Sequence, residues 1–295
     1  MFIKDDSTMP GGTFKARGAC IGLSRAVELG VKSVVMPTAG NAGGTWSLYA
    51  ARAGIEITVV MSASAPKTNQ IEVTAAGGTL ELVEGSIADA GKRAQEIAAE
   101  TGVFLATTFS EPYRLEGKKS AWFEIFDDLG NGSEMAFPGT IVLPVGGGVA
   151  AIAAAKAARE VIDAGWCRGE PPILVGVQAA NCAPIVKAFE EGRDDVPTWA
   201  GDPMTVAAGL RVPAPAEGAL VLKTIHGSQG TMVAVNEDKI IAAMRDLAAT
   251  EGVFACPEGA ATLPAAQQLA SEGHLRSPVV LYNTGSGHKY LDVLG

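Results

Sequence analysis

Short apolar runs alternate with stretches of helical periodicity along almost the whole chain. The apolar runs, most of them bounded by turn residues, predict strands. These strands cover residues 1–6, 33–36, 57–61, 79–83, 102–106, 140–143, 173–177, 232–235 and 279–282. Apolar spacings of three and four predict helices at residues 45–53, 67–76, 86–101, 119–129, 151–164, 183–191 and 237–249. This alternation is typical of parallel sheets that carry helices on both faces.

Two stretches interrupt the alternation. Residues 130–133 form a Gly-Asn-Gly-Ser connector, and residues 196–215 are rich in proline and glycine and predict a long loop over the functional site. We therefore expect two α/β domains. Residues 33–130 form the smaller one, and residues 1–32 and 131–295 form the larger one.

A single lysine stands where the first helix is expected to begin. Residues 10–12 (Pro-Gly-Gly) break the first strand with a turn whose glycines suit positive φ, and Thr13 is a suitable N-cap. Lys15 then lies in the first helical turn, where the helix dipole and loss of water both favour the neutral amine. A neutral amine is a nucleophile toward aldehydes. The alternative is an ordinary solvated cation, which is the usual state of a lysine.

Three further glycine-rich turns follow predicted strands, at residues 37–44, 144–149 and 283–289. The first two lead into helices, so their bare backbone N–H groups and the helix dipole favour an anion. Gly146, Gly148 and Ala151 also satisfy the dinucleotide-binding spacing. However, Glu160 and Asp163 are too close for the ribose-binding acid, which is expected about 20 residues further on. Nicotinamide binding is therefore disfavoured.

Composition narrows the possible partners. The chain has 295 residues, of which 47% are hydrophobic, which is enough for an enzyme-sized core. A formal net charge of -9 argues against nucleic acid or an anionic membrane as the main partner. The four cysteines are widely spaced and predict free, mostly buried thiols in a reducing cytoplasm, with no metal site. No secretory leader or membrane span is expected.

In this order, the lysine turn and the three glycine-rich turns resemble the pyridoxal-phosphate-dependent enzymes of fold type II, and among them the threonine synthase family. The resemblance covers essentially the whole chain and is strongest at residues 177–192, 255–262 and 283–295. It implies pyridoxal 5'-phosphate as cofactor and two open, mostly parallel twisted sheets with helices on both faces, as in the tryptophan synthase β-like fold. Family members usually carry several dozen more residues before the lysine turn, so we expect a shortened N-terminus.

The resemblance also implies roles for individual residues. Lys15 anchors the cofactor as a Schiff base and then removes the substrate's α proton. The remaining cofactor-binding residues are Asn41 at the ring hydroxyl, Gly146, Gly147, Gly148 and Val149 at the phosphate, and Thr284 at the ring nitrogen, with Ser286 as a second candidate there. The substrate-binding residues are Thr38, Gly40 and Ala42 for the carboxylate and Arg114 for a substrate phosphate. Glu258 is expected to border the ring, His288 to be structural, and His226 and His274 to lie at the surface.

The implied reaction is that of threonine synthase, in which O-phospho-L-homoserine and water give L-threonine and phosphate, in a cytoplasmic homodimer. Two departures from the family pattern weaken the expected phosphate site. Residues 107–109 (Thr-Thr-Phe) replace an Asn-Ser pair before Arg114, and Ala16 replaces an acidic residue after the lysine. The alternatives are a serine or threonine dehydratase, a β-replacement enzyme, and a catalytically silent homologue that acts as a binding subunit.

Overall fold

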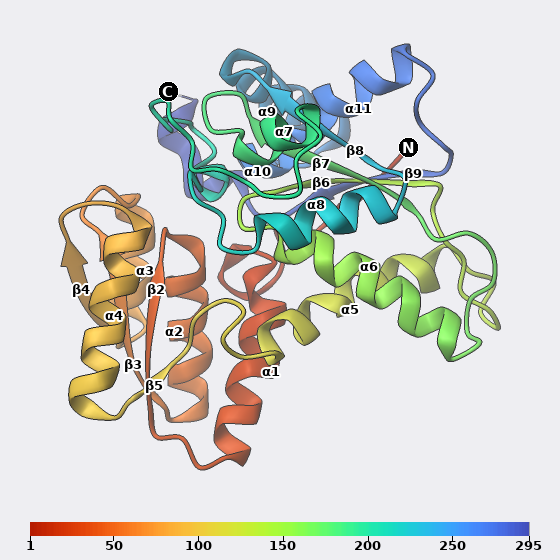
Figure 1. Ribbon diagram of the computed structural model, residues 1–295. Coiled ribbons are helices and arrows are strands. Elements are labelled where there is room, and N and C mark those ends of the chain that lie inside the picture. The colour runs from red at the N-terminus through yellow and green to blue at the C-terminus, as the bar shows by residue number, and fades with distance from the viewer. Residues whose placement is uncertain (295) are drawn as a thin grey trace. The chain divides into compact units, whose positions relative to one another are not determined.

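The computed structural model describes residues 1–294, which form two parallel sheets with helices on both faces (Figure 1). The chain separates by its contacts into two compact units. The smaller unit runs from Met9 to Lys118, and the larger one combines Met1–Thr8 with the chain from Lys119 onward. The predicted fold class is confirmed.

The smaller unit contains a four-stranded sheet in the order β4-β3-β2-β5. Its strands are β2 (Ser33–Thr38), β3 (Glu56–Ser62), β4 (Thr79–Val83) and β5 (Phe104–Leu105), and every pair is parallel. Its helices are α1 (Lys15–Glu28), α2 (Asn41–Ala53), α3 (Lys67–Ala75) and α4 (Ile87–Thr101). Val34 and Met36 join a core with α1, α2 and α3, whereas Val35 packs with α4 on the other face. This alternation follows from the two-residue period of a strand.

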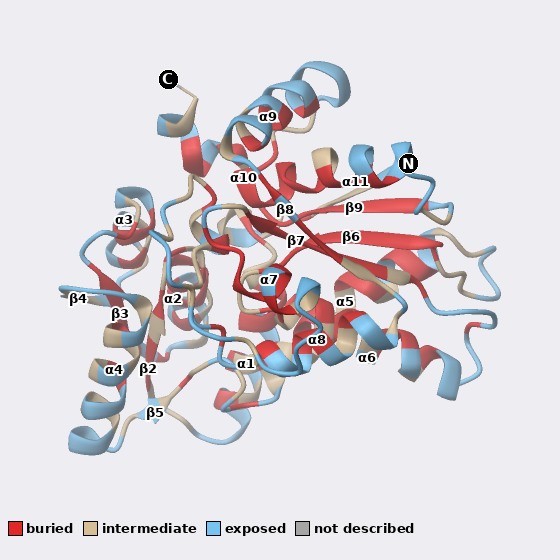
Figure 2. Cartoon of the chain, turned by 45° about the horizontal axis from the view of Figure 1, so that its top comes forward, coloured by how far each residue is buried: buried red, intermediate tan, exposed pale blue. Residues whose placement is uncertain are grey.

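The larger unit contains a five-stranded parallel sheet in the order β1-β9-β6-β7-β8. Its strands are β1 (Phe2–Asp5), β6 (Thr140–Pro144), β7 (Ile173–Ala179), β8 (Thr231–Val235) and β9 (Val279–Asn283). The helices that lie wholly within this unit are α6 (Val149–Asp163), α7 (Pro184–Glu190), α8 (Gly218–Gly227), α9 (Glu237–Glu251), α10 (Pro257–Ala260) and α11 (Thr262–Ser271). Figure 2 shows β6, β7 and β9 as almost entirely buried, as expected for strands covered on both faces.

Each predicted strand is present, and the helices differ from prediction mainly at their beginnings. Helix α2 begins at Asn41 and not at residue 45, because the glycines of the preceding turn adopt helical conformation. Helix α5 (Tyr113–Asp128) begins six residues earlier than residue 119. Three helices were not predicted: α8, α10 and α11. Proline stands in the first turn of both α10 and α11, where its missing N–H costs nothing.

The boundaries of the two units also differ from those expected from the sequence. Residues 9–32 belong to the smaller unit, because α1 packs closely on α2; a Cβ on Gly22 would lie 2.9 Å from the Trp46 ring. Residues 119–130 belong to the larger unit, where Trp122 packs on Tyr282 with their ring centroids 4.8 Å apart. The division therefore falls within α5.

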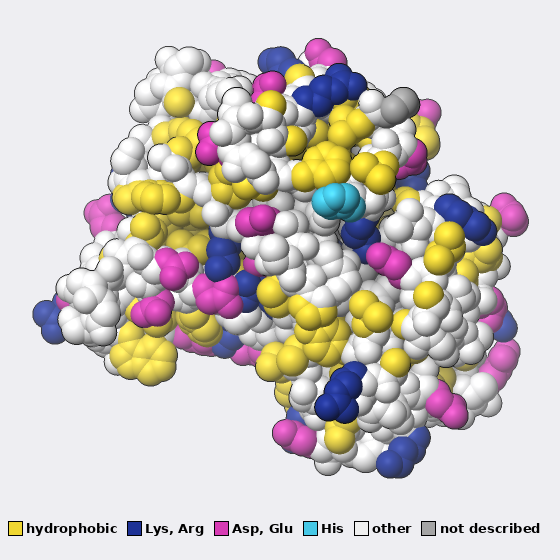
Figure 3. All heavy atoms as spheres, turned by 180° about the vertical axis from the view of Figure 1, so that it is seen from behind, with side chains coloured by type: hydrophobic (Ala, Val, Ile, Leu, Met, Phe, Trp, Pro, Cys, Tyr) yellow, Lys and Arg dark blue, Asp and Glu magenta, His cyan; other side chains and the backbone are white. Residues whose placement is uncertain are grey.

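The composition of the chain predicts the character of its surface and the state of its cysteines. On the face shown in Figure 3, basic and acidic side chains are interspersed. Among residues 1–294, no helix is both long enough and apolar enough to cross a membrane. All four cysteines are free thiols; three are buried and Cys20 is exposed, as expected.

Candidate active site

The lysine turn is built as the sequence predicts, apart from its cap. Gly11 and Gly12 have φ of 75° and 65°, which a residue with a side chain rarely adopts. Lys15 is the first residue of α1, and Phe14, not Thr13, is the N-cap. The Thr13 hydroxyl instead accepts the Lys15 amide at 3.5 Å. The Lys15 Nζ lies 3.9 Å from the centroid of the Phe14 ring, so the amine is held beside an apolar surface.

Local packing brings this turn against the loop that follows β2. A Cβ on Gly11 would lie 2.8 Å from the Thr45 hydroxyl, which donates to the Asn41 carbonyl at 3.0 Å. In the same loop, the Thr38 hydroxyl accepts the Gly40 amide at 3.1 Å. Within the smaller unit, the lysine turn therefore lies beside the first turn of α2, which contains the candidates Asn41 and Ala42 and directly follows Thr38 and Gly40. Thr38 already uses its hydroxyl to shape the loop.

Arg114 is surrounded by protein groups that contact its guanidinium and is only 6% exposed. Its guanidinium donates to the Thr108 hydroxyl at 3.0 Å and to the Ala106 carbonyl at 2.9 Å. Its Nε lies 3.2 Å from a carboxylate oxygen of Glu111, and the guanidinium carbon lies 4.4 Å from the centroid of the Trp46 ring. These contacts hold the side chain in place, and Glu111 balances its charge.

Lys118 is a buried lysine that no sequence motif singles out. Its side chain donates to the Arg114 carbonyl at 3.1 Å, and the residue is 4% exposed. Burial lowers the pKa of Lys118 well below its ordinary value of 10.5, and the charges of Arg114 and Lys15 lower it further, whereas Glu111 opposes the shift. Lys118 occupies the space beside Gly18, because a Cβ there would lie 2.9 Å from its Nζ. Only packing between α1 and α5 could have revealed this cluster.

The triple-glycine loop of the larger unit follows β6 and opens α6. Gly148 has φ of 81°, and a side chain on it would collide with Val221, while one on Gly146 would collide with the Gly209 carbonyl. A Cβ on Gly147, in contrast, would meet nothing within 4 Å. The loop thus leaves open space beside bare backbone at the start of a 15-residue helix, which fits a phosphate group.

Thr284 reaches the same edge of the larger sheet as this loop. Strands β6 and β9 are parallel neighbours, with Val142 opposite Leu281, so the turns after both strands lie at one edge. Thr284 is 5% exposed, and its hydroxyl lies 3.5 Å from the Cys256 sulfur. Burial, followed by the charge of Glu258, raises the pKa of Cys256 well above its ordinary value, so the thiol keeps its proton.

Two polar residues stabilise the glycine loop and the segment that packs on it. Gln178 donates to the Val145 carbonyl at 3.1 Å, and its amide oxygen accepts from the backbone N–H groups of Ile185 and Val186. Glu258 accepts the Gly209 amide at 2.6 Å and the Tyr290 hydroxyl at 2.8 Å. Since Gly209 packs on Gly146, Glu258 fixes the long loop over the glycine turn. Both residues lie in the segments that carry the family resemblance, and this resemblance is the sequence signal that could have identified them.

The residues after Thr284 have mainly local roles. Ser286 caps the 3-10 helix Gly287–Val293, and its hydroxyl lies 2.9 Å from Nδ1 of His288. His288 is exposed and meets the Phe254 ring edge to face, with centroids 5.0 Å apart. His226 and His274 are exposed, as expected.

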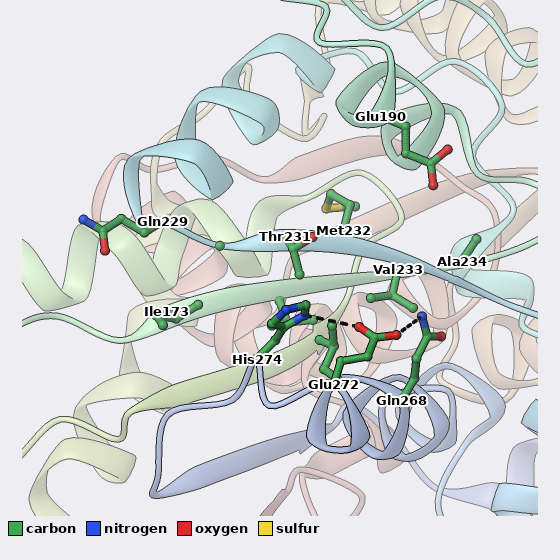
Figure 4. A pocket seen from close by; sticks show the side chains of 13 residues that line it. Ile173, Glu190, Gln229, Thr231, Met232, Val233, Ala234, Gln268, Glu272 and His274 are labelled. Carbon is green, nitrogen blue, oxygen red and sulfur yellow. Dashed lines mark hydrogen bonds and ion pairs between the residues drawn. The ribbon is translucent and has the colours of Figure 1, made fainter.

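A separate cavity is lined by none of the candidate cofactor-binding or substrate-binding residues. It has a volume of about 590 Å³ and follows the edge strand β8 (Figure 4). Glu272 on its wall lies 3.2 Å from Nδ1 of His274 and accepts from the Gln268 amide at 3.3 Å. No candidate cofactor-binding residue lines this cavity, so we assign it no part in the chemistry.

The chain is similar to known proteins over most of its length. A family model described as pyridoxal-phosphate dependent enzyme matches residues 1–285. The threonine synthase of Methanosarcina acetivorans is 31% identical over 293 residues, which cover 99% of this chain and 71% of that protein. The threonine synthase of Methanocaldococcus jannaschii is 30% identical and is matched over 98% of this chain and 70% of its own length.

Solved structures share the fold. A threonine deaminase from T.th. superposes with a TM-score of 0.80 at 24% identity, covering 96% of this chain and 86% of that one. Maize serine racemase also has a TM-score of 0.80, at 21% identity, covering 97% and 82% of the two chains. The chain belongs to the family of pyridoxal-phosphate-dependent enzymes, and its relatives place it with the threonine synthase-like lyases of fold type II.

Lys118 leads to a prediction about stability. Replacing Lys118 with methionine should raise the free energy of unfolding by about 1–2 kcal/mol at neutral pH, because the buried ammonium is costly. The pKa of Lys118 is lower in the folded than in the unfolded chain, so unfolding takes up protons and the cost declines as pH rises toward 10.5. Urea unfolding between pH 7 and pH 10 should therefore show the gain shrinking. The exposed Lys92→Met variant is the control, and a gain independent of pH would contradict the assignment.

The glycine loop leads to a second prediction. Gly148→Ala should lower the free energy of unfolding by about 1–3 kcal/mol, because positive φ and the contact with Val221 both oppose a side chain. Gly147→Ala should keep the stability of the parent, yet bind pyridoxal phosphate at least about tenfold more weakly, because its methyl group fills the open space. Chemical unfolding and cofactor titration measure the two effects. Unchanged cofactor affinity in Gly147→Ala would place the phosphate elsewhere.

Proposed function

We propose that this protein is a threonine synthase that converts O-phospho-L-homoserine and water to L-threonine and phosphate. The observation that carries the proposal is the similarity to threonine synthases at 30–31% identity over 98–99% of the chain. The sequence motif that contains Arg114 also supports it. The partner is then a small phosphorylated amino acid, and a cytoplasmic homodimer remains our expectation for the assembly.

In this proposal, the cofactor is held by Lys15, by the amides of Gly146, Gly147, Gly148 and Val149 at its phosphate, by Asn41, and by Thr284. When bound, pyridoxal phosphate withdraws electrons from the α carbon of an amino acid and so acidifies its hydrogen. The Lys15 amine then takes the α proton as a base. It lies at the N-terminus of α1, where the positive end of the helix dipole favours the neutral amine that can accept a proton.

Thr284 faces the ring nitrogen in this arrangement. Its neighbour Cys256 keeps its proton and carries no charge, so the ring nitrogen receives only a neutral hydroxyl. A neutral partner does not require that nitrogen to be protonated, which suits elimination better than chemistry that stores a full charge in the ring. Ser286 is a weaker candidate for this contact, because its hydroxyl already caps a helix and bonds His288.

A dehydratase acting on serine or threonine is the second candidate, and the surroundings of Arg114 favour it. The Arg114 guanidinium is engaged by Thr108, Ala106 and Glu111, so binding a substrate phosphate requires it to act through its remaining N–H groups beside a carboxylate. Lys118 adds a positive charge nearby when it is protonated. A dehydratase needs no second phosphate site.

The role of Lys15 is tested through the cofactor's visible absorbance. Purified protein with pyridoxal phosphate should show an absorbance band from the lysine-bound cofactor, and Lys15→Ala should lose it because the amine is gone. Borohydride reduction followed by peptide mass spectrometry should locate the cofactor on Lys15. The exposed Lys92→Ala variant should keep both signals. A cofactor mass found on another lysine would refute the assignment.

The two candidate reactions are separated by their products. Threonine synthase activity releases inorganic phosphate from O-phospho-L-homoserine and forms threonine, whereas a dehydratase forms a ketoacid from serine or threonine. We expect phosphate release to dominate by at least about tenfold in kcat/KM. Ketoacid as the only product would establish the dehydratase. Bound cofactor without turnover of any amino acid would support a silent binding subunit.

A further inference from the structure

Residues 205–212 of the long loop pack on the triple-glycine turn of the larger unit. A side chain on Gly146 would collide with the carbonyl of Gly209, so the two backbones are in direct contact. Gly209 lies in the 3-10 helix Ala208–Leu210, and Leu210 is buried in the core of this unit. The position of the segment therefore decides whether the turn after β6 keeps the shape in which its backbone N–H groups face an anion.

Two carboxylates hold this segment by its backbone. Glu258, in α10, accepts the Gly209 amide at 2.6 Å, and the same oxygen accepts the Tyr290 hydroxyl at 2.8 Å. Glu237, in α9, accepts the Val206 amide at 2.9 Å. Glu258 is 5% exposed, so its bond to Gly209 is shielded from water. Of these two carboxylates, Glu258 is the one that binds the residue in contact with the glycine turn.

The burial of Glu258 has an electrostatic cost. A buried carboxylate is costly to desolvate, and its negative charge repels an anion bound nearby. Within residues 1–294, its Oε2 atom is buried and has no hydrogen-bond partner, whereas Oε1 accepts both donors. A charged acceptor forms hydrogen bonds about twice as strong as those of a neutral one. The carboxylate is therefore explained by the strength with which it holds Gly209, and not by a favourable charge at this turn.

We propose that Glu258 is a positioning residue for the cofactor phosphate, which holds Gly209 against Gly146 and so keeps the glycine turn in its anion-binding shape. The inference rests on one part of the proposed function, the assignment of the phosphate to the triple-glycine turn. It holds for either candidate reaction, because both use the same cofactor. Loss of the Glu258 acceptor should therefore weaken binding of the phosphate group and leave binding of the cofactor ring largely unchanged.

The test compares two ligands of the cofactor-free protein, pyridoxal 5'-phosphate and pyridoxal, which has the same ring and aldehyde but lacks the phosphate. The ratio of their dissociation constants, read from cofactor absorbance, measures the preference for the phosphate. Glu258→Ala should lower this preference about tenfold and change the affinity for pyridoxal by less than about twofold. Glu258→Gln keeps an acceptor oxygen for Gly209 and loses the repelling charge, so it should keep the preference of the parent protein.

Two further variants separate positioning from stability. Gly209→Ala disturbs the same contact from the other side, because its Cβ would lie 2.8 Å from Oε1 of Glu258. It should reproduce the loss of preference, and it keeps the test decisive if Glu258→Ala does not fold. Glu237→Ala releases Val206, which is not among the atoms nearest to Gly146, so it should lower the melting temperature and leave the preference unchanged.

Three outcomes would contradict the proposal. An unchanged preference in Glu258→Ala and Gly209→Ala, together with a lost preference in Gly147→Ala, would overturn the inference and leave the phosphate assignment intact. A preference that rises in Glu258→Ala would also overturn it, because the carboxylate would then act mainly by repelling the phosphate. Parent protein that binds both ligands equally well would refute the phosphate assignment in the proposed function, and the inference with it.

Discussion

The structure depends on the close approach of bare backbone where strands give way to helices. In each unit the strands are parallel, so the turns that follow them gather at one edge, and the helices that begin there present unpaired N–H groups. Glycine allows this approach. Gly11 meets Thr45, Gly146 meets Gly209, and Gly148 meets Val221, and none of these contacts leaves room for a side chain. An enzyme that binds an anionic cofactor and an amino-acid carboxylate needs such surfaces, because backbone amides bind anions without adding fixed charge.

Electrostatics in the smaller unit adds a second constraint. Lys118 is buried near Lys15 and Arg114, and Glu111 balances only part of this positive charge. Such an excess is costly in the folded protein, and it is the kind of cost that proteins retain at functional sites. Contacts within the same cluster leave Arg114 with fewer N–H groups for a substrate phosphate. Its partner Thr108 comes from residues 107–109, the segment in which the sequence departs from the threonine synthase pattern, whereas Glu111 lies in the motif that contains Arg114.

Much of the fold could be predicted because local patterns encode it. The two-residue and 3.6-residue periods located the strands and most helices, and the glycine-rich turns located the sheet edges at which we propose that ligands bind. The predictions failed where a local signal was ambiguous. The sequence predicts a turn at residues 41–44, although they form the first turn of α2, because glycine permits both conformations. Thr13 was assigned as a cap, but the helix begins one residue later, so the hydroxyl meets the amide of Lys15 only weakly.

The sequence by itself determined the family, the cofactor and the lysine turn, because periodicity, glycine conformation and motif order are properties of the chain alone. Only the tertiary structure decided that α1 belongs with α2, that Arg114 is tied to Glu111, and that Lys118 and Asn69 are buried. The physical reason is that burial and hydrogen-bond satisfaction depend on which residues meet across elements distant in sequence. The sequence of a helical segment does not distinguish a lysine or an asparagine that faces water from one that is buried beside a glycine.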